Sequence, residues 1–575
     1  MDERRKQDLE KLLANGDNNT DIPSVPTSSH QLPSRPVDFI GREAEIRELL
    51  AKIQDGGVTI SGLRGMGGIG KTALALVLAD KLHKQYPYQL LIDLQGAAEQ
   101  QSLSSAQAMQ KIITDIDPQI KPPDDVEQLK RVYCSLLSDK VSNGLPVLLL
   151  LDNARDAEQV KPLIPPRGCV AIVTSRQYFS LQGWYVKNLD VLPADDARDL
   201  LIKVASEMSI DIANQICSMC GYLPLAICAA GSQIAGTPDL LPVKYATRLK
   251  DERRRFQAIG KEKKELGVEL DLEACFNLSY RGLSEDSARV FRMLAVFPYS
   301  FDSEAEEMVC EDEEHRCLSE LVRRSLVLFD QVSERYRLHD LVRLFADAKL
   351  GDDERYKVQE RHSAHYCGVL NYATDLYEKG NDNVLAGLKL FDTERVNIET
   401  GQKWAVENAE KDERVAGLCD DYPYVGSYVL SLRLHPRERI GWLEAALSAT
   451  RKMGWKNSEG EHLGCLGLAY WSLGEYRKAI EYHEQSLTTA REIGDRKGEG
   501  NALCNLGNAY AALGDTHKAI SYCYNLYNLA ETLNTLGKLS QAIACAEESL
   551  KISELIEDPY AEETRRFLAR LRSQQ

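Results

Sequence analysis

The stretch that decides the fold of the N-terminal half is GMGGIGKT, at Gly65–Thr72. It fits the pattern G-x-x-x-x-G-K-[S/T] at every specified position. It follows the apolar stretch Val58–Ser61, which is predicted as a strand, and it opens the helix-forming sequence KTALALVLADKL. Glycines in such a loop let backbone N–H groups turn inward around an anion, and the following helix N-terminus adds positive potential. The stretch therefore predicts a phosphate-binding loop between a strand and a helix.

Each loop residue has an expected role in this chemistry. Lys71 is expected to reach the β- and γ-phosphates, and the Thr72 hydroxyl is expected to hold Mg²⁺. The pattern therefore predicts ATP or ADP, with Mg²⁺, as ligands of the chain. The glycines expected to cradle the phosphates are Gly65, Gly67, Gly68 and Gly70.

The same glycines also spell G-x-G-x-x-G, which is the pattern of a dinucleotide-binding turn. Two features favour the phosphate loop. The Lys-Thr pair follows the last glycine directly, and no ribose-binding acid is expected at the end of the next strand. Asp93 is expected inside that strand, predicted over Leu90–Leu94, so it is a poor candidate for the ribose contact.

A second part of the nucleotide site is predicted in LPVLLLLDNARD, at Leu145–Asp156. A buried strand ending in Asp152 would place a carboxylate beside the loop, where it holds Mg²⁺ through water. Many ATPases carry a second acid at the next position, which orients the attacking water. Here that position is Asn153, which cannot act as a base, so hydrolysis is expected to be slow.

Apolar runs alternate with amphipathic helical patterns up to about residue 190. This alternation predicts an α/β domain with a parallel sheet covered by helices on both faces. Beyond it, residues 194–250 are mostly helical, and residues 272–350 read as helices, two short strands and a further helix, which suits a winged-helix domain. The predicted strands of the sheet are Val58–Ser61, Leu90–Leu94, Val147–Leu151 and Val170–Thr174.

Six motifs in order resemble those of the NB-ARC ATPases, which belong to the STAND class of signal-transduction ATPases. The resemblance covers residues 37 to about 350, and the LDNA sequence together with the C-terminal repeats is typical of bacterial members. The motifs are FIGRE (39–43), GMGGIGKT (65–72), LLLLDNA (148–154), VAIVTSR (170–176), GYLPLA (221–226) and RLHD (337–340).

The resemblance implies roles for four further residues. Arg42 would lie near the adenine and ribose, Arg176 would sense the γ-phosphate, and Pro224 would pack on the base. His339 would contact the β-phosphate of ADP and lock the winged helix, with Leu338 replacing the methionine of the family motif. Each also has a plainer alternative: a surface arginine, a surface ion pair, a helix-start proline and a helix cap.

This resemblance implies a switch with catalytic residues Asp152 and Arg176. ADP would hold a closed state, exchange for ATP would open it, and slow hydrolysis would reset it. The expected divisions are a short helix and linker (1–36), the nucleotide-binding domain (37–192), a helical subdomain (193–260), a winged helix (261–350), a helical spacer (351–453) and tetratricopeptide repeats with a capping helix (454–575).

The C-terminal part repeats itself at an offset of 40 positions. Ten of seventeen residues are identical between Leu466–Tyr482 and Leu506–Tyr522, and the pattern is that of tetratricopeptide repeats. Such arrays bind peptides or proteins, so a protein partner is expected, although a purely intramolecular scaffold is the alternative. A third unit at Leu529–Ile543 comes too early. We therefore expect residues near 516–536 to form one longer helix, with no turn between Tyr522 and Leu529.

Composition narrows the class of protein. The formal charge is −17, which disfavours general binding to nucleic acid phosphates. No apolar run approaches the length of a membrane span and the N-terminus lacks a signal sequence, so a cytoplasmic protein is expected. The fourteen cysteines include one close pair, Cys217 and Cys220, for which core packing is favoured over a metal or redox site.

Two other functions compete with the switch. One is a transcriptional regulator whose winged helix binds DNA through Arg316, Arg323 and Arg324, although acidic residues surround them. The other is an ordinary turnover ATPase, which Asn153 disfavours. About 36 residues precede FIGRE, so we expect that any effector is a separate protein, and that activation involves a homo-oligomer.

Overall fold

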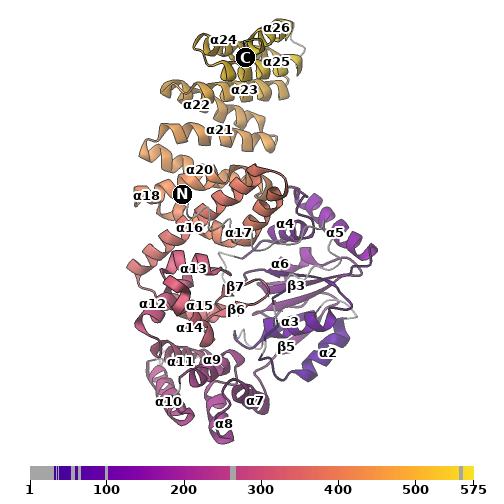
Figure 1. The fold of residues 1–575 in the computed structure, drawn as a ribbon. Helices are drawn as coiled ribbons and strands as arrows, with labels where there is room; N and C mark the ends of the chain where they lie inside the picture. Colours follow the sequence, from indigo (N-terminus) through magenta and orange to yellow (C-terminus); the bar gives the residue numbers. More distant parts are fainter. Residues whose placement is uncertain are drawn as a thin grey trace. The chain divides into compact units, whose positions relative to one another are not determined.

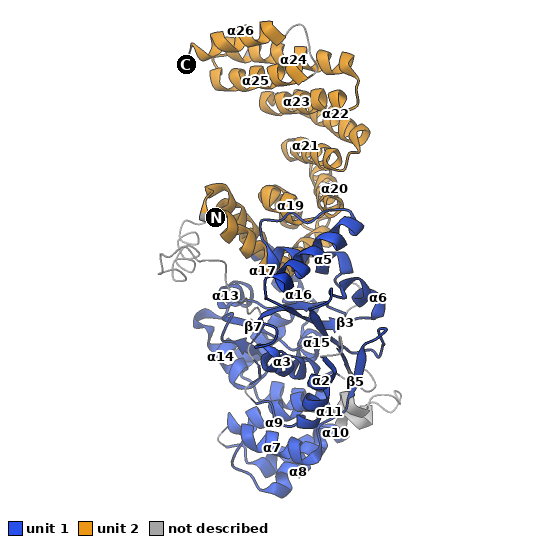
Figure 2. Cartoon of the chain, turned by 90° about the vertical axis from the view of Figure 1, so that its right-hand side faces the viewer, with its two compact units in different colours: residues 1–365 blue, residues 366–575 orange. Residues whose placement is uncertain are grey.

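The computed structural model describes residues 32–33, 35–36, 38–53, 58–62, 67–96, 102–237, 239–259, 267–555 and 561–574. The chain forms two compact units, residues 1–365 and 366–575, which are coloured separately in Figure 2. The predicted N-terminal helix, most of the predicted linker, and Gly65 lie outside the described residues.

A parallel sheet of five strands organises the first unit, in the order β2-β3-β4-β1-β5. Its strands β3 and β5 are labelled in Figure 1. Among the described strands, β1 pairs with β4 and β5, whereas β2 pairs with β3. In a dinucleotide-binding unit the first two strands are neighbours, so this order argues against that alternative and favours the phosphate loop. The bounds are β1 Val58–Gly62, β2 Tyr88–Asp93, β3 Val147–Ala154, β4 Val170–Ser175 and β5 Tyr185–Leu189.

The central strands are buried on both faces, as their continuous apolar sequence predicts. Helices α4 and α5 cover the face to which Val147, Leu149 and Leu151 project. Successive residues of a strand alternate between faces, so Leu148 and Leu150 project to the opposite side. Helix α3 contacts β1, β3 and β4. The helices of this domain are α2 Glu43–Ile53, α3 Lys71–Leu82, α4 Ser105–Ile116, α5 Val126–Ser142, α6 Ala157–Val160 and the short η2 Lys161–Leu163.

The structure corrects the strand predictions at three places. Strand β3 does not end at Asp152 but runs to Ala154, with a register shift after Leu151 and Asn153 at φ 54°. Asp93 is the last residue of β2 rather than an interior one. Strand β5 had no apolar run to reveal it, because it is a half-buried edge strand.

Five helices follow the sheet: α7 Ala194–Val204, α8 Ile210–Met219, α9 Pro224–Ala235, α10 Pro242–Ile259 and α11 Gly267–Arg281. Helix α9 packs between α7 and α11 and is mostly buried. The Cys217 thiol donates to the Ala197 carbonyl oxygen at 3.2 Å, and the Cys220 sulfur lies 3.6 Å from that of Cys275. Both cysteines of the close pair are fully buried, as core packing predicts.

A helical cluster with a two-stranded hairpin comes next, as the order of predicted elements requires. Aromatic rings of Phe276, Tyr280, Phe291 and Phe345 pack together in its core. The elements are α12 Glu285–Met293, η3 Leu294–Val296, α13 Ser303–Cys310, η4 Glu313–His315, α14 Arg316–Arg323, β6 Leu328–Asp330, β7 Arg335–Arg337 and α15 Asp340–Lys349. This order of helices, hairpin and final helix agrees with the predicted winged-helix domain, and we keep that name for it.

The second unit is helical throughout its described residues. No described helix of the chain is both long enough and apolar enough to pass through a bilayer. Helix α16, Asp352–Lys379, crosses from the first unit into the second. It is followed by α17 Asp382–Asn408, α18 Glu413–Val425, α19 Ser427–Arg433, α20 Pro436–Met453, α21 Lys456–Ser472, α22 Tyr476–Ile493, α23 Arg496–Ala512, α24 Thr516–Thr535, α25 Leu539–Leu555 and α26 Ala561–Arg572.

The sequence repeat is reproduced in side-chain contacts. Tyr470 stacks on Tyr482 with ring centroids 5.3 Å apart, and Tyr510 stacks on Tyr522 at 5.5 Å, 40 positions later. The same offset relates the ion pair of Arg451 with Glu459 to that of Arg491 with Glu499, both at 2.8 Å. Arg451 belongs to α20, so the repeating network extends to a helix inside the segment predicted as a spacer.

The shortened third unit forms as predicted: α24 is a single helix with no turn between Tyr522 and Leu529. The Ser486 hydroxyl of α22 donates to the Gly460 carbonyl of α21 at 2.9 Å. The Ser549 hydroxyl of α25 donates to the Cys523 carbonyl of α24 at 3.0 Å. Ser549 follows Ser486 by the same number of positions as Cys523 follows Gly460. Helix α24 therefore pairs with α25 as α21 pairs with α22, so this one helix belongs to two repeats.

A histidine in this array predicts a pH-dependent stability. His483 is buried against Gly467, and burial lowers its pKa to about 4. The unfolded chain, with a histidine pKa near 6.5, binds the proton more readily. The contribution of the neutral His483 to the free energy of unfolding is therefore fully present above about pH 6.5. It is lost as the pH drops toward 4, by on the order of 2–3 kcal/mol for a shift of this size.

The test replaces His483 with cysteine, because Cys523 is buried at the equivalent place in the next repeat. We expect the His483→Cys variant to lose less stability between pH 7 and pH 4.5 than the unaltered chain in urea unfolding. An equal loss in both proteins would contradict the expectation. The exposed His517 of the same array provides the control, and His517→Ala should leave the pH dependence unchanged.

Candidate nucleotide-binding site

The described part of the phosphate loop has the backbone that anion binding requires. Gly68 and Gly70 have φ angles of 75° and 93°, which only glycine adopts without strain. Lys71 follows as the first residue of α3 and is buried, with 8% of its surface exposed. The loop therefore ends on a helix N-terminus with a buried cation beside it, which is an arrangement that fits phosphate groups.

The two oxygen donors predicted to hold Mg²⁺ lie together. The Thr72 hydroxyl donates to Oδ1 of Asp152 at 2.8 Å, and the Thr174 hydroxyl donates to the same carboxylate oxygen. Burial raises the pKa of Asp152, whereas the hydrogen bonds from Thr174 and Thr72 lower it. Hydroxyl and carboxylate oxygens are the ligands that Mg²⁺ prefers, so the residues present fit this ion.

Asn153 lies at the bend in β3 and turns toward the neighbouring strand. Its backbone N–H donates to the Thr174 hydroxyl at 3.0 Å, and its side-chain amide donates to Oδ1 of Asp93 at 3.3 Å. Burial, together with the charges of Asp152 and Asp340, raises the pKa of Asp93 to about 7. The edge of the sheet therefore carries a second carboxyl group next to Asp152.

Arg42 is buried beneath the loop and is not a surface arginine. Its guanidinium donates to the Asp190 carbonyl at 2.6 Å and to the Ile69 carbonyl at 3.4 Å, and it pairs with Glu45 at 3.2 Å. Its own backbone has φ 70°. The side chain thus ties the loop to the end of β5. Whether it also contacts adenine or ribose stays a prediction.

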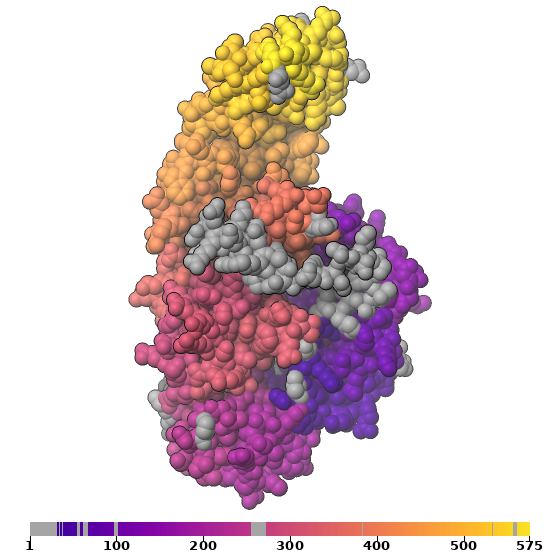
Figure 3. Space-filling view, in the orientation of Figure 1, coloured from indigo at the N-terminus to yellow at the C-terminus, as the bar shows by residue number. Residues whose placement is uncertain are grey.

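The helical subdomain contributes the start of α9 to the site. Pro224 is the first residue of α9, and its Cγ lies 3.8 Å from where a Cβ on Gly70 would stand. The Leu225 backbone N–H donates to the Gly68 carbonyl at 3.4 Å. In the space-filling view the helical subdomain, in magenta, adjoins the indigo nucleotide-binding domain (Figure 3). The proline is thus a helix-start residue that also lies against the loop.

The winged-helix domain contributes the start of α15. The Asp340 carboxylate accepts a hydrogen bond from the Arg176 guanidinium at 2.9 Å, which joins this domain to the end of β4. His339 is the N-cap of α15, with Nδ1 accepting from the Leu341 N–H at 3.2 Å. A Cβ on Gly67 would lie 2.6 Å from Cδ1 of Leu341. The N-termini of three helices, α3, α9 and α15, therefore meet at one loop.

Basic side chains lie close together beside the phosphate loop, and their charges lower the pKa values of Lys71 and His339. Burial and the charge of Arg176 lower the pKa of Lys71 to about 8. Burial lowers the pKa of His339 to about 4; the charge of Asp340 opposes this shift, whereas Arg176, Arg337 and Lys71 add to it. His339 is therefore neutral at pH 7. Cations held this close are stabilised by a bound anion, which is a further sign that the residues fit a nucleotide's phosphates.

The structure adds residues that the sequence motifs did not single out. Thr174 and Leu225 lie inside the motifs VAIVTSR and GYLPLA but had no expected role, and Leu341 directly follows RLHD. Arg337 begins RLHD, but only the structure shows that its charge acts on His339. Asp93 was set aside as an interior strand residue. The register of β2 against β3 is the signal that could have found it, because Asp93 pairs with Asp152.

Comparison with known proteins agrees with this geometry. Residues 42–211 match the NB-ARC domain, and residues 459–523 and 524–554 match tetratricopeptide repeats. The regulatory protein AfsR of Streptomyces coelicolor is 35% identical over 349 residues, covering 56% of this chain and 33% of that protein. A Mycobacterium bovis protein, named as an HTH-type transcriptional regulator, is 26% identical over 415 residues, covering 68% of this chain and 44% of that protein.

The chain thus spans about a third to under a half of the length of these curated relatives. A solved structure from Pyrococcus horikoshii, a signal transduction ATPase with numerous domains (STAND) carrying a tetratricopeptide repeat sensor, is 18% identical. Its alignment covers 94% of this chain and 93% of that chain, with a TM-score of 0.42. On the matched domains and the motifs they contain, the chain carries an NB-ARC domain and, toward its C-terminus, tetratricopeptide repeats.

Proposed function

We propose that the chain is an ATP/ADP switch in which the bound nucleotide decides whether the winged-helix domain stays on the phosphate loop. The observation that carries this proposal is the ion pair of Arg176 with Asp340, which joins the two domains at the loop itself. Leu341, the residue after Asp340, covers Gly67. The described arrangement is therefore a closed one, and we assign it to the ADP state.

The ion pair supplies the difference between the two nucleotides. A guanidinium at the carboxyl edge of a parallel sheet is suited to a γ-phosphate, as expected for Arg176. The γ-phosphate and the Asp340 carboxylate would then compete for the same cation. A ligand changes a conformational equilibrium only through its different affinity for the two states. ATP would weaken the closed state by this competition, whereas ADP would leave the ion pair intact.

His339 is arranged to favour the ADP state. Because Nδ1 accepts the Leu341 N–H, the proton of the neutral ring is on Nε2. Nε2 can therefore donate a hydrogen bond to a phosphate oxygen while the ring also caps α15. This ties the start of the winged-helix domain's last helix to the nucleotide. Mg²⁺, when bound at Thr72 and Asp152, would offset phosphate charge.

The proposal predicts faster nucleotide exchange when this donor is removed. His339→Asn retains a capping oxygen for α15 but is too short to reach the phosphate. A hydrogen bond to a charged acceptor contributes about 1.5–3 kcal/mol, so fluorescent ADP should dissociate roughly 10–100-fold faster in stopped-flow measurements.

The control is His435, which caps α20 in the same way, with Nδ1 accepting from the Arg437 N–H at 3.1 Å. His435→Asn should leave the rate of ADP release unchanged. An unchanged rate in His339→Asn as well would contradict the role given to His339. The same preparations show whether ADP copurifies with the unaltered chain, as the proposal expects.

The repeats are suited to control the switch, because arrays of this kind bind protein partners. We propose that a protein or peptide on the array favours the open state and that open chains assemble into homo-oligomers. Light scattering with ADP and with a slowly hydrolysed ATP analogue tests the second point. A larger mass with the analogue supports it, and the same mass in both samples opposes it.

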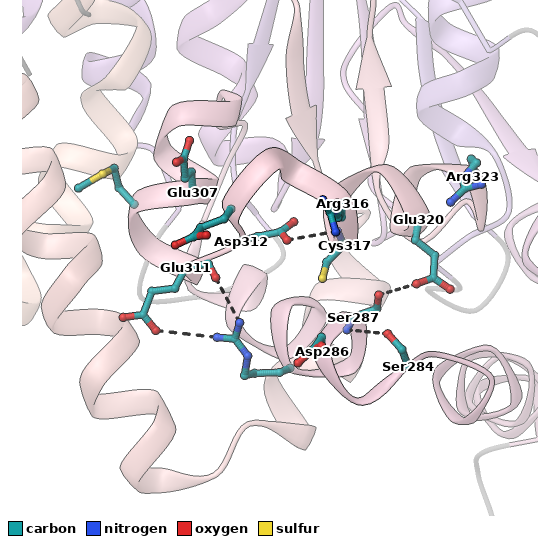
Figure 4. Close-up of a pocket in the computed structure, with 13 residues that line it drawn as sticks. Ser284, Asp286, Ser287, Glu307, Glu311, Asp312, Arg316, Cys317, Glu320 and Arg323 are labelled. Carbon is teal, nitrogen blue, oxygen red and sulfur yellow. Dashed lines mark hydrogen bonds and ion pairs between the residues drawn. The ribbon is translucent and has the colours of Figure 1, made fainter.

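DNA binding by the winged-helix domain is a second candidate function. The helices α12, α13 and α14 followed by a hairpin favour it, as does the name of the Mycobacterium bovis relative. The surroundings of α14 argue against DNA binding. A pocket beside this helix is lined by arginines, and acidic side chains surround these arginines (Figure 4). Arg316 pairs with Glu314, and Arg289 pairs with Glu311. Salt-dependent binding to genomic DNA fragments would favour this function. A chain that does not bind these fragments would have the nucleotide switch as its one proposed function.

A further inference from the structure

At one position of the nucleotide site an amide stands where many ATPases carry an acid. Asn153 stands directly after Asp152, where many ATPases carry an acid that orients water, and an amide cannot accept a proton from water. The backbone at Asn153 has φ 54°, a left-handed conformation, and the β3–β4 register shifts at this point. The bend turns the amide toward β2 and allows its hydrogen bond with Asp93.

Asp93 has the position that a replacement acid would need. It pairs in register with Asp152 across the parallel strands β2 and β3, so the two side chains project from the same face of the sheet. Its Oδ1 accepts from the Asn153 amide at 3.3 Å and from the Gln95 backbone N–H at 2.9 Å. Both bonds go to one oxygen, and none is found from the described residues to Oδ2.

The surroundings of Asp93 place it at the phosphate end of the site. The carboxylate of its register partner Asp152 accepts a hydrogen bond from the Thr72 hydroxyl, so Asp93 adjoins the expected Mg²⁺ position. Arg176, expected at the γ-phosphate, directly follows β4, which is the next strand beyond β3 in the sheet. Burial and the charges of Asp152 and Asp340 raise the pKa of Asp93. Asp93 thus belongs to the same charged cluster as the residues assigned to the γ-phosphate.

We propose that Asp93, held by the amide of Asn153, is the catalytic base that accepts the proton of the water attacking the γ-phosphate. The water oxygen forms a bond to the γ-phosphorus, and the bond from that phosphorus to the β–γ bridging oxygen breaks. The bridging oxygen keeps the electron pair and leaves as ADP, while the water proton passes to Oδ2 of Asp93. Asn153 is a positioning residue. The inference rests on the proposed function, because it concerns ATP at the same site.

The test uses exchange of the two side chains in the full-length chain. Asp93→Asn keeps the acceptor oxygen for Gln95 but cannot take a proton. The double variant Asp93→Asn with Asn153→Asp restores one carboxylate and one amide with their places exchanged. Asp139→Asn, on the exposed surface of α5, is the matched control for the same chemical change. ATP and ADP affinities and the single-turnover rate of hydrolysis are measured for each.

We expect Asp93→Asn to hydrolyse ATP about 100-fold or more slowly, the usual effect of losing a general base, with dissociation constants changed less than about threefold. The double variant should recover at least about tenfold of that rate, which a merely structural role would not produce. Asp139→Asn should match the unaltered chain.

Three results would overturn the inference. These are a rate in Asp93→Asn within about threefold of the unaltered chain, a double variant no faster than Asp93→Asn, or an unaltered chain that binds ATP without hydrolysing it. Failure of the proposed function is distinguishable, because the unaltered chain would then not bind ATP or ADP at all.

Discussion

Lys71→Ala is expected to weaken the binding of both ADP and ATP by at least about 100-fold, which corresponds to about 2.8 kcal/mol. The side chain is the buried cation at the start of α3, and a charge-assisted contact to phosphate is among the stronger hydrogen bonds in proteins. The loss should be similar for the two nucleotides, because both carry the β-phosphate that Lys71 is expected to reach. Isothermal titration calorimetry measures both affinities directly.

Lys81→Ala is the matched control, since Lys81 is exposed in the last turn of the same helix. It should bind nucleotide as the unaltered chain does. A Lys71→Ala chain that is folded by circular dichroism and still binds with unaltered affinity would contradict the assignment of the phosphate loop. The thermal midpoint gives a second readout, because a ligand stabilises only a chain that binds it.

Asp340→Asn is expected to shift the nucleotide preference toward ATP by about tenfold, or about 1.4 kcal/mol. In the unaltered chain the Asp340 carboxylate, 28% exposed, neutralises Arg176, 25% exposed, at 2.9 Å. The variant keeps the size of the side chain but frees the guanidinium for the γ-phosphate. ADP has no such group, so its affinity should not gain. The measured quantity is the ratio of the ADP and ATP dissociation constants.

The control for this variant is an ion pair of the same exposure that does not involve the loop. Arg292 and Glu354, each 23% exposed, pair at 3.0 Å. Glu354→Gln should leave the ratio of the two dissociation constants unchanged. A ratio in Asp340→Asn within about twofold of the unaltered chain would show that the ion pair does not compete with the γ-phosphate.

The sequence predicted those parts of the site that depend on short, local patterns. The phosphate loop, the strand carrying Asp152 and the start of α9 at Pro224 are each set by a few consecutive residues, and the described residues of these segments lie together in the structure, although β3 continues to Ala154. The same holds for α24, because the shortened repeat leaves too few residues for a turn. The parallel α/β domain, winged helix and repeat array also follow from periodicity over longer stretches.

What sequence did not predict depends on how strands and domains meet. Strand β5 is half-buried and polar in part, so its pattern lacks the apolar run of a central strand. Leu94 is buried after the end of β2, which is why the apolar pattern extended that strand past Asp93. The pairing of Arg176 with Asp340 requires the winged helix to dock, and no local pattern encodes a contact between such distant positions.

The central claim is that the nucleotide controls contact between the winged-helix domain and the phosphate loop. Fluorescence resonance energy transfer tests it most directly, with dyes attached through unnatural amino acids at the exposed Asp139 of α5 and Val332 of the hairpin. We predict high transfer with ADP and lower transfer when ADP is exchanged for a slowly hydrolysed ATP analogue. Equal transfer with both nucleotides, in a chain that binds both, would contradict the switch.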